Sequence, residues 1–124
     1  VKIMVRANAE LTIGGSQKSL SGITSDTIII CSKKIIIGRD SIISWNVYIS
    51  DSSQHKIDGI ERINDIEIGN NVWLSEGVTI SYGTKVGNGS IVGSKSFLNG
   101  IFEENTLIAG IPAKIKKYNI KWER

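Results

Sequence analysis

His55 is the only histidine among the 124 residues of this chain. An imidazole exchanges its proton near neutral pH, so this side chain could act as a general base that deprotonates an attacking hydroxyl. Such a base needs a partner that fixes its tautomer. The carboxylates of Asp51 and Glu61 are close in sequence, and a backbone carbonyl would serve as well, so the sequence leaves the partner open.

The other reactive side chains suggest simpler roles. Cys31 is the single cysteine, which excludes an internal disulfide and fits a reducing compartment, so we predict a cytoplasmic protein. It lies six residues before Ile37, at a position expected to point inward, and we interpret it as a small buried hydrophobe. The sequence contains the residue types of a Ser–His–Asp triad, but each serine is explained by its place in the repeat described below. Without a C-x-x-C motif or a histidine pair, we predict no metal site.

Positive charge is concentrated at the end of the chain. Residues 114–124 contain five basic residues and one acid, whereas the whole chain has a net charge of +3. A basic tail on a nearly neutral body suits a small polyanionic ligand better than nucleic acid. Nucleic acid is usually bound by a broader basic surface with a recognised motif. No apolar run reaches the ~18 residues of a membrane span, and the opening VKIMVRANAE lacks the apolar core of a signal peptide.

These residues are set in a regular repeat. An aliphatic residue recurs at every sixth position, at Ile37, Ile43, Ile49, Ile68, Leu74, Ile80, Val86, Val92 and Leu98. Four residues after each lies a small or β-branched residue in eight of nine cases, and the exception, Phe102, marks the end of the run. Glycine and asparagine punctuate the repeat, as in IGNN (68–71) and VGNG (86–89), which favours tight turns. The pattern predicts a parallel β-solenoid with coils of 18 residues stacked about 4.8 Å apart.

The repeat is interrupted once, around His55. The coil after Ile37 should return at residue 55, yet the aliphatic series resumes at Ile68, thirteen residues late. We therefore predict a loop at about 53–65, leaving the solenoid near Ser52 and returning near Asp65. Long loops on regular scaffolds are often functional. Residues 1–36 form earlier, less regular coils, so the chain is a single domain, 1–124, with a C-terminal tail at 114–124.

IGNNVWLSEGVTI (68–80) and SFLNGIFEENTLIAGIPAKIKK (96–117) resemble sequences of the hexapeptide-repeat acyltransferases. The similarity is to galactoside and maltose O-acetyltransferases and to bacterial surface-polysaccharide O-acetyltransferases, and it is firm over residues 35–117. It implies a mainly β fold, a single-stranded left-handed parallel β-helix with triangular coils. It also implies transfer of an acetyl group from acetyl-CoA to a hydroxyl, here on a sugar of a glycan or its precursor, by a homotrimer with active sites between its subunits.

The same resemblance suggests roles for individual residues. His55 lies in the loop where the family has its catalytic histidine, so direct transfer with His55 as base and backbone N–H groups holding the oxyanion is expected. The distance in sequence from His55 to Trp73 is shorter than in the galactoside enzymes, which implies a different acceptor pocket. Acceptor-side candidates are Trp45, Asn46 and Asp51. Cofactor-binding candidates are Trp73, Ser75, Gly93, Ser94, Asn99, Lys114 and Lys117. Trp122 has no predicted role.

Three other functions were compared with this one. An N-acetyltransferase acting on an amino sugar or nucleotide sugar shares the mechanism and stays open. A non-catalytic trimeric solenoid, acting as a scaffold or binding protein, also stays open, although it would need neither the histidine loop nor a basic tail. The carbonic anhydrase branch of the fold requires three histidines around each metal, drawn from two subunits, and one histidine per chain cannot supply them.

Overall fold

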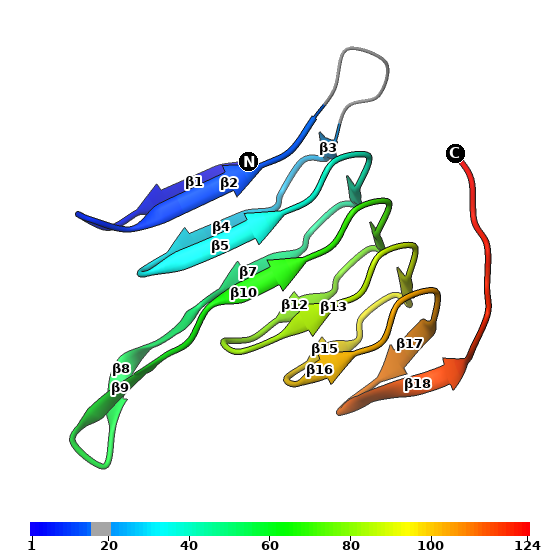
Figure 1. Ribbon diagram of the computed structural model, residues 1–124. Helices are drawn as coiled ribbons and strands as arrows, with labels where there is room; N and C mark the ends of the chain where they lie inside the picture. Colours follow the sequence, from blue (N-terminus) through cyan, green and yellow to red (C-terminus); the bar gives the residue numbers. More distant parts are fainter. Residues whose placement is uncertain (16–20) are drawn as a thin grey trace.

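The computed structural model describes residues 1–15 and 21–124, and in these ranges every regular element is a β-strand. Figure 1 shows the strands wound as successive coils of one helix. The predicted left-handed parallel β-helix is confirmed. Each coil contributes strands to three sheets, which we name faces A, B and C in chain order, and the turns between them corners AB, BC and CA. No helix long and apolar enough to cross a membrane is present in the described residues.

The three faces are parallel sheets except at the last strand. Face A contains β1 (Lys2–Val5), β4 (Ile28–Cys31), β7 (Tyr48–Ser50), β12 (Thr79–Ile80) and β15 (Phe97–Leu98). Face B contains β2 (Glu10–Ile13), β5 (Lys34–Ile37), β10 (Ile66–Ile68), β13 (Lys85–Val86) and β16 (Ile101–Phe102). Face C contains β3 (Gly22–Ile23), β6 (Ile42–Ile43), β11 (Trp73–Leu74), β14 (Ile91–Val92), β17 (Leu107–Gly110) and the antiparallel β18 (Ala113–Lys117).

The strand register confirms the predicted stacking. Ile68 pairs with Val86, Leu74 with Val92 and Ile80 with Leu98, each 18 residues apart. Across the interruption Ile37 pairs with Ile68, a separation of 31 residues, which is 18 plus the thirteen predicted extra residues. Like side chains therefore stack on like, and the inward aliphatic residues of the repeat are buried as one continuous core.

The last coil is shorter than the pattern predicts. Val86 pairs with Phe102 and Val92 with Ile108, 16 residues apart rather than 18. Corner AB is reduced in this coil to Asn99 and Gly100, and Gly100 has a φ of 154°. Phe102 consequently lies on strand β16, packed against the core, and not at the small-residue corner position that the repeat assigned to it.

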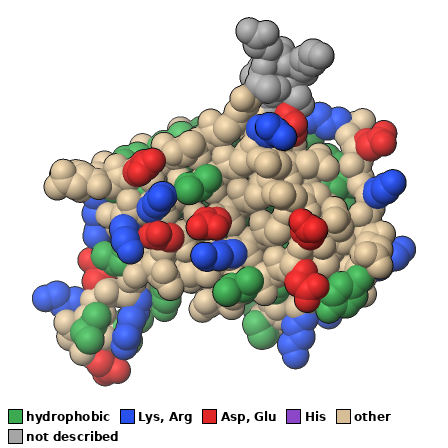
Figure 2. Space-filling view, viewed as in Figure 1, with side chains coloured by type: hydrophobic (Ala, Val, Ile, Leu, Met, Phe, Trp, Pro, Cys, Tyr) green, Lys and Arg blue, Asp and Glu red, His purple; other side chains and the backbone are tan. Residues whose placement is uncertain are grey.

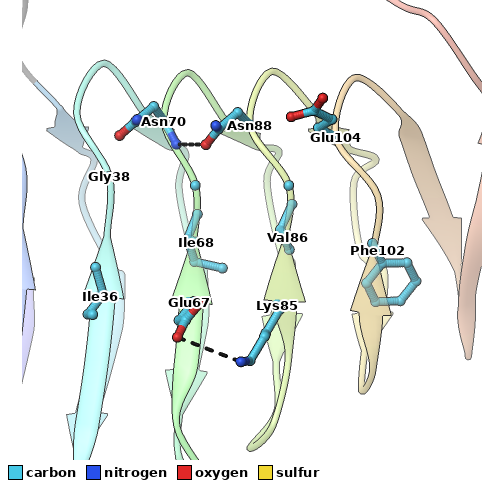
Figure 3. A pocket seen from close by; sticks show the side chains of 12 residues that line it. Ile36, Gly38, Glu67, Ile68, Asn70, Lys85, Val86, Asn88, Phe102 and Glu104 are labelled. Carbon is cyan, nitrogen blue, oxygen red and sulfur yellow. Dashed lines mark hydrogen bonds and ion pairs between the residues drawn. The ribbon is translucent and has the colours of Figure 1, made fainter.

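Corner BC explains the IGNN and VGNG sequences. The Asn70 side-chain carbonyl accepts the N–H of Arg39 at 3.0 Å, and that of Asn88 accepts the N–H of Asn70 at 2.7 Å, so asparagines join successive coils (Figure 3). A Cβ at Gly69 would meet the Asn88 side chain and backbone. Only glycine leaves room for the asparagine ladder at this spacing.

Gly38, Gly69 and Gly87 stack on successive coils, and we call them the glycine column. This column leaves a hollow of about 560 Å³ beside the strands of face B. Figure 3 shows its side chains, with Glu67 and Lys85 paired on adjacent coils at 3.7 Å. None of the predicted site residues lines it. We therefore attribute this hollow to the missing side chains of the glycines and not to a ligand.

The C-terminal tail returns along the outside of the helix (Figure 1). The N–H of Ile120 donates to the Asn105 carbonyl at 3.0 Å, and the Trp122 indole N–H donates to the Asn71 carbonyl at 2.8 Å. The Trp122 ring also lies against Trp73, with centroids 5.8 Å apart. The tail thus follows corner BC, and Trp122, for which the sequence predicted no role, packs beside a predicted cofactor residue.

We predict that Gly69→Ala destabilises the protein by about 2–3 kcal/mol, because the added methyl group must displace Asn88 or the backbone. Thermal and urea unfolding would measure the loss. Gly22→Ala is the matched control, since a Cβ at Gly22 would meet no heavy atom within 4 Å. Equal stability of the Gly69 variant and the control would contradict the steric role of the glycine column.

Candidate active site

The predicted loop is a β-hairpin at corner AB. It consists of β8 (Ser52–Ile57) and β9 (Ile60–Ile63), joined by Asp58 and Gly59. Both turn residues have positive φ, 50° and 79°, which matches the Asp-Gly turn favoured in two-residue hairpins. The hairpin extends well beyond the helix body (Figure 1), and the exposed His55 lies on its first strand.

Glu61 anchors the base of this hairpin. Its carboxylate accepts the Ser52 hydroxyl at 2.5 Å and the Arg6 guanidinium at 2.6 Å, so the hairpin is tied to the chain just after β1. The Ser52 hydroxyl, and then Arg6, lower the pKa of Glu61. Because both partners hold the carboxylate, Glu61 acts as an anchor. It does not hydrogen-bond to the His55 imidazole, the orienting role left open by the sequence.

Asp51 has a role different from the predicted one. It is fully buried, and its carboxylate accepts the backbone N–H groups of Ser32 at 2.7 Å and of Lys33 and Lys34 at 2.8 Å. These bonds close corner AB of the preceding coil. We therefore correct its assignment: Asp51 is not positioned to contact an acceptor or to orient His55.

Cys31 is buried beside Asp51, as its inward position predicted. Burial raises the pKa of the Cys31 thiol, and the Asp51 charge raises it further. The thiol is therefore protonated near neutral pH, which makes it a poor nucleophile. The structural interpretation made from the sequence is confirmed for this residue.

The His55 imidazole makes no hydrogen bond or ion pair with any residue that the structure describes. Glu61 is close enough to interact with it electrostatically. The hairpin around it is rich in exposed aliphatic side chains, namely Ile57, Ile60 and Ile63, which are 47%, 56% and 39% exposed. Figure 2 shows the hairpin as a protrusion carrying both basic and apolar side chains. The imidazole and these isoleucines are therefore exposed together on the hairpin of the single chain.

Most of the other candidates lie at corner CA. Trp45 and Asn46 are exposed there on one coil, Ser75 follows on the next, and Gly93 and Ser94 on the one after. Register places Ser44, Ser75, Gly93 and Ala109 in one column, and a Cβ at Gly93 would lie 3.2 Å from that of Ala109. Small residues therefore stand at the same position of this corner on four successive coils.

The remaining candidates flank this corner or lie apart from it. Trp73 projects from face C, and its indole N–H donates to the Ser44 hydroxyl at 3.2 Å. Lys114 and Lys117 are exposed on β18 of the same face. Asn99 is exposed at corner AB, on the side of the hairpin. One chain therefore leaves His55 and Asn99 on the side of corner AB and the other cofactor candidates at corner CA and on face C, so His55 is not brought together with them.

Metal binding has no support in the part of the chain that the structure describes. Residues 1–15 and 21–124 contain no group of three or more His, Cys, Asp and Glu side chains arranged to hold an ion.

Comparison with known proteins agrees with this geometry. The family described as bacterial transferase hexapeptide (six repeats) matches residues 65–100. The crystal structure of the polysialic-acid-specific acetyltransferase NeuO is 31% identical, covers 91% of this chain and 50% of its own, and has a TM-score of 0.82. A search of curated proteins gave no significant match.

Two further structures extend the comparison. The polysialic acid O-acetyltransferase OatWY is 30% identical over 98% of this chain and 66% of its own, with a TM-score of 0.68. The acetyltransferase VCA0836 of Vibrio cholerae O1 biovar eltor, complexed with acetyl coenzyme A, is 23% identical over 94% of this chain and 68% of its own. Its TM-score is 0.77, and at this identity the similarity supports a shared fold only. Together the matches confirm the resemblance to hexapeptide-repeat O-acetyltransferases. The chain spans about half of NeuO and about two thirds of OatWY.

We predict that acid loosens the hairpin only below the usual titration range of a glutamate. Since the folded-state pKa of Glu61 is lowered from its ordinary value of 4.5, its anchoring is complete above pH 4.5 and is lost as the pH falls through the lower folded-state value. Hydrogen exchange of hairpin amides between pH 6 and pH 3 would show this. Glu61→Gln should open the hairpin at every pH, whereas the control Glu67→Gln on face B should not. A wild-type hairpin that loosens above pH 5 would contradict the prediction.

Proposed function

We propose that the chain forms the β-helix of an acetyl-CoA-dependent O-acetyltransferase that acts on a sugar hydroxyl of a glycan or glycan precursor. NeuO and OatWY, which support this proposal, are both described as polysialic acid acetyltransferases, and VCA0836 was crystallised with acetyl coenzyme A. The single observation that carries the proposal is the hairpin that interrupts the repeat and presents the only histidine, exposed, beyond the helix body.

The division of the site between two corners supports a homotrimer. If three copies pack side by side, the hairpin at corner AB of one copy reaches corner CA of the next. The exposed isoleucines of the hairpin would then be buried against the neighbour, and His55 would meet the cofactor candidates of that chain. Each of the three active sites would be shared by two subunits, which also accounts for the lack of an intrachain partner for the imidazole.

In this arrangement His55 acts as the general base. The imidazole takes the proton of the acceptor hydroxyl while the oxygen attacks the thioester carbon of acetyl-CoA. The C–O bond forms first and gives a tetrahedral oxyanion; its collapse breaks the C–S bond, and the coenzyme leaves as a thiolate that can recover the proton from the imidazolium. Backbone N–H groups would stabilise the oxyanion. No covalent intermediate on Cys31 is required, in agreement with its raised pKa.

The coenzyme would lie along corner CA. Its extended arm needs open backbone, which the column through Gly93 provides, and its phosphates need cations, which Lys114 and Lys117 provide on β18. Trp73 and Ser75 lie one coil before Gly93, on the side away from β18, with Ser94 next to Gly93 and Asn99 one corner further. Asn46 and Trp45 remain the acceptor-side candidates. We also propose a cytoplasmic location, which a single unpaired cysteine supports.

The prediction for the donor concerns coenzyme A binding by the trimer. Calorimetric titration should give saturable binding that weakens about tenfold in Lys114→Ala/Lys117→Ala, because two charge-assisted contacts are removed. Lys116→Ala/Lys121→Ala removes the same charge from the same tail and should weaken binding much less. If the intact trimer binds no coenzyme A, the non-catalytic solenoid becomes the better interpretation.

The prediction for the base is that His55→Ala lowers the rate of acetyl transfer by about 10²–10⁴-fold, the usual contribution of a general base. Coenzyme A affinity and trimer formation should be unchanged. Lys56→Ala, next to it on the hairpin, should retain most of the activity. Full activity of His55→Ala would eliminate His55 as the base.

Assays with neutral sugars and with amino sugars as acceptors would separate O-acetylation from the N-acetyltransferase alternative.

A further inference from the structure

A second hollow lies on face A, directly beside the base of the hairpin. It has a volume of about 220 Å³ and is lined by three strands of the helix wall, β7, β12 and β15, and by the hairpin residues that immediately precede His55. This is below the ~300–1,000 Å³ typical of drug-sized ligands, so it suits a single ring. No residue predicted from the sequence to act in the site lines this hollow.

The wall of the hollow is an aromatic platform. Tyr48, Thr79 and Phe97 pair in register on three successive strands of face A. Because Ile49, Ile80 and Leu98 are fully buried, the alternation along each strand turns the platform residues outward. The two aromatic rings therefore stand two coils apart with a hydroxyl between them, and Tyr82 adds a third ring at the next corner.

The opposite side of the hollow is polar and held in place. The Gln54 side-chain amide donates to the Ser50 hydroxyl at 2.9 Å, and the Gln54 backbone N–H donates to the Ser52 hydroxyl at 2.9 Å. Gln54 has a φ of 66°, so the chain turns sharply one residue before His55. Ser53 and Ser81 add further hydroxyl groups to the lining. The polar groups are positioned by the hairpin before any ligand enters.

The hollow has no charged side chain in its lining. Arg6 contacts the Gln54 side-chain oxygen at 3.4 Å but is paired with Glu61 at 2.6 Å. The ionised Glu61 lies just behind Ser52, to which it is hydrogen-bonded. Because Glu61 and Arg6 neutralise each other, a carboxylate entering the hollow would lose its hydration without gaining an ion pair from the lining, which is costly. An uncharged ring with several hydroxyl groups would satisfy both the aromatic and the polar side.

We propose that this hollow is the acceptor subsite and that it selects an uncharged sugar ring over a sialic acid. This inference rests on the proposed function, because the ring is held beside the hairpin that carries His55. It separates the acceptor of this chain from the acidic polymer named for NeuO and OatWY. Tyr48, Phe97 and Gln54 are the specificity-determining residues.

Binding without coenzyme A tests this directly. The trimer is titrated, with detection by saturation-transfer NMR, with neutral disaccharides (maltose, lactose, cellobiose and chitobiose) and with a sialic acid dimer. At least one neutral disaccharide should bind at least about tenfold more tightly than the sialic acid dimer. Phe97→Ala should weaken that binding about tenfold or more, as expected for an aromatic anchor. Phe102→Ala, the other phenylalanine of the chain, lies on face B and should leave it unchanged.

Gln54→Asn provides a second variant, because asparagine tolerates the left-handed backbone while shortening the amide. It should weaken the neutral sugar and leave the fold intact. Tighter binding of the sialic acid dimer, no binding of any neutral disaccharide, or binding unaffected by both variants would overturn the proposal. Coenzyme A titration of the same samples is independent of these outcomes, so failure of the acceptor subsite is distinguishable from failure of the acetyltransferase proposal.

Discussion

The spacing between neighbouring coils is the constraint on which the rest of this structure depends. Parallel strands stack at about 4.8 Å, so each side chain has its counterpart on the next coil directly beside it. Aliphatic residues facing inward then form an unbroken core, and asparagines at corner BC can join successive turns. The same spacing excludes a Cβ at Gly69 and would bring a Cβ at Gly93 to 3.2 Å from that of Ala109. Both the scaffold and the proposed cofactor groove follow from one distance.

The fold was readable from the sequence because each coil repeats the same local requirement. The six-residue period located the inward residues, and its lapse gave the length of the insertion. The hairpin form of that insertion was also signalled, by Asp58 and Gly59 between two strand-like segments, although the sequence was interpreted only as a loop. The shortened last coil was not predicted. Its corner AB, formed by Asn99 and Gly100, is two residues shorter than in the preceding coil, and this change leaves the aliphatic pattern almost intact.

The site was less predictable, for a physical reason. Asp51 was predicted as an acceptor-side residue and as a possible partner of His55, to which it is close in sequence. Its actual partners, the N–H groups of residues 32–34, are adjacent only once coils have stacked. The aromatic platform of Tyr48 and Phe97 is likewise created by register, since the two residues are 49 positions apart. A sequence motif lies on one coil and indicates the chemistry of that coil. A pocket on the wall of a solenoid is formed by residues from several coils, which the motif does not reveal.

The returning tail has a consequence for the mechanics of the whole helix. In a solenoid each coil normally contacts only its two neighbours, so the ends can fray one turn at a time. Here Ile120 and Trp122 bond to Asn105 and Asn71, which are on coils that do not touch each other. The tail acts as a lengthwise tie, and peeling the last coil away requires releasing contacts two coils further in. The C-terminal half therefore behaves as one cooperative block.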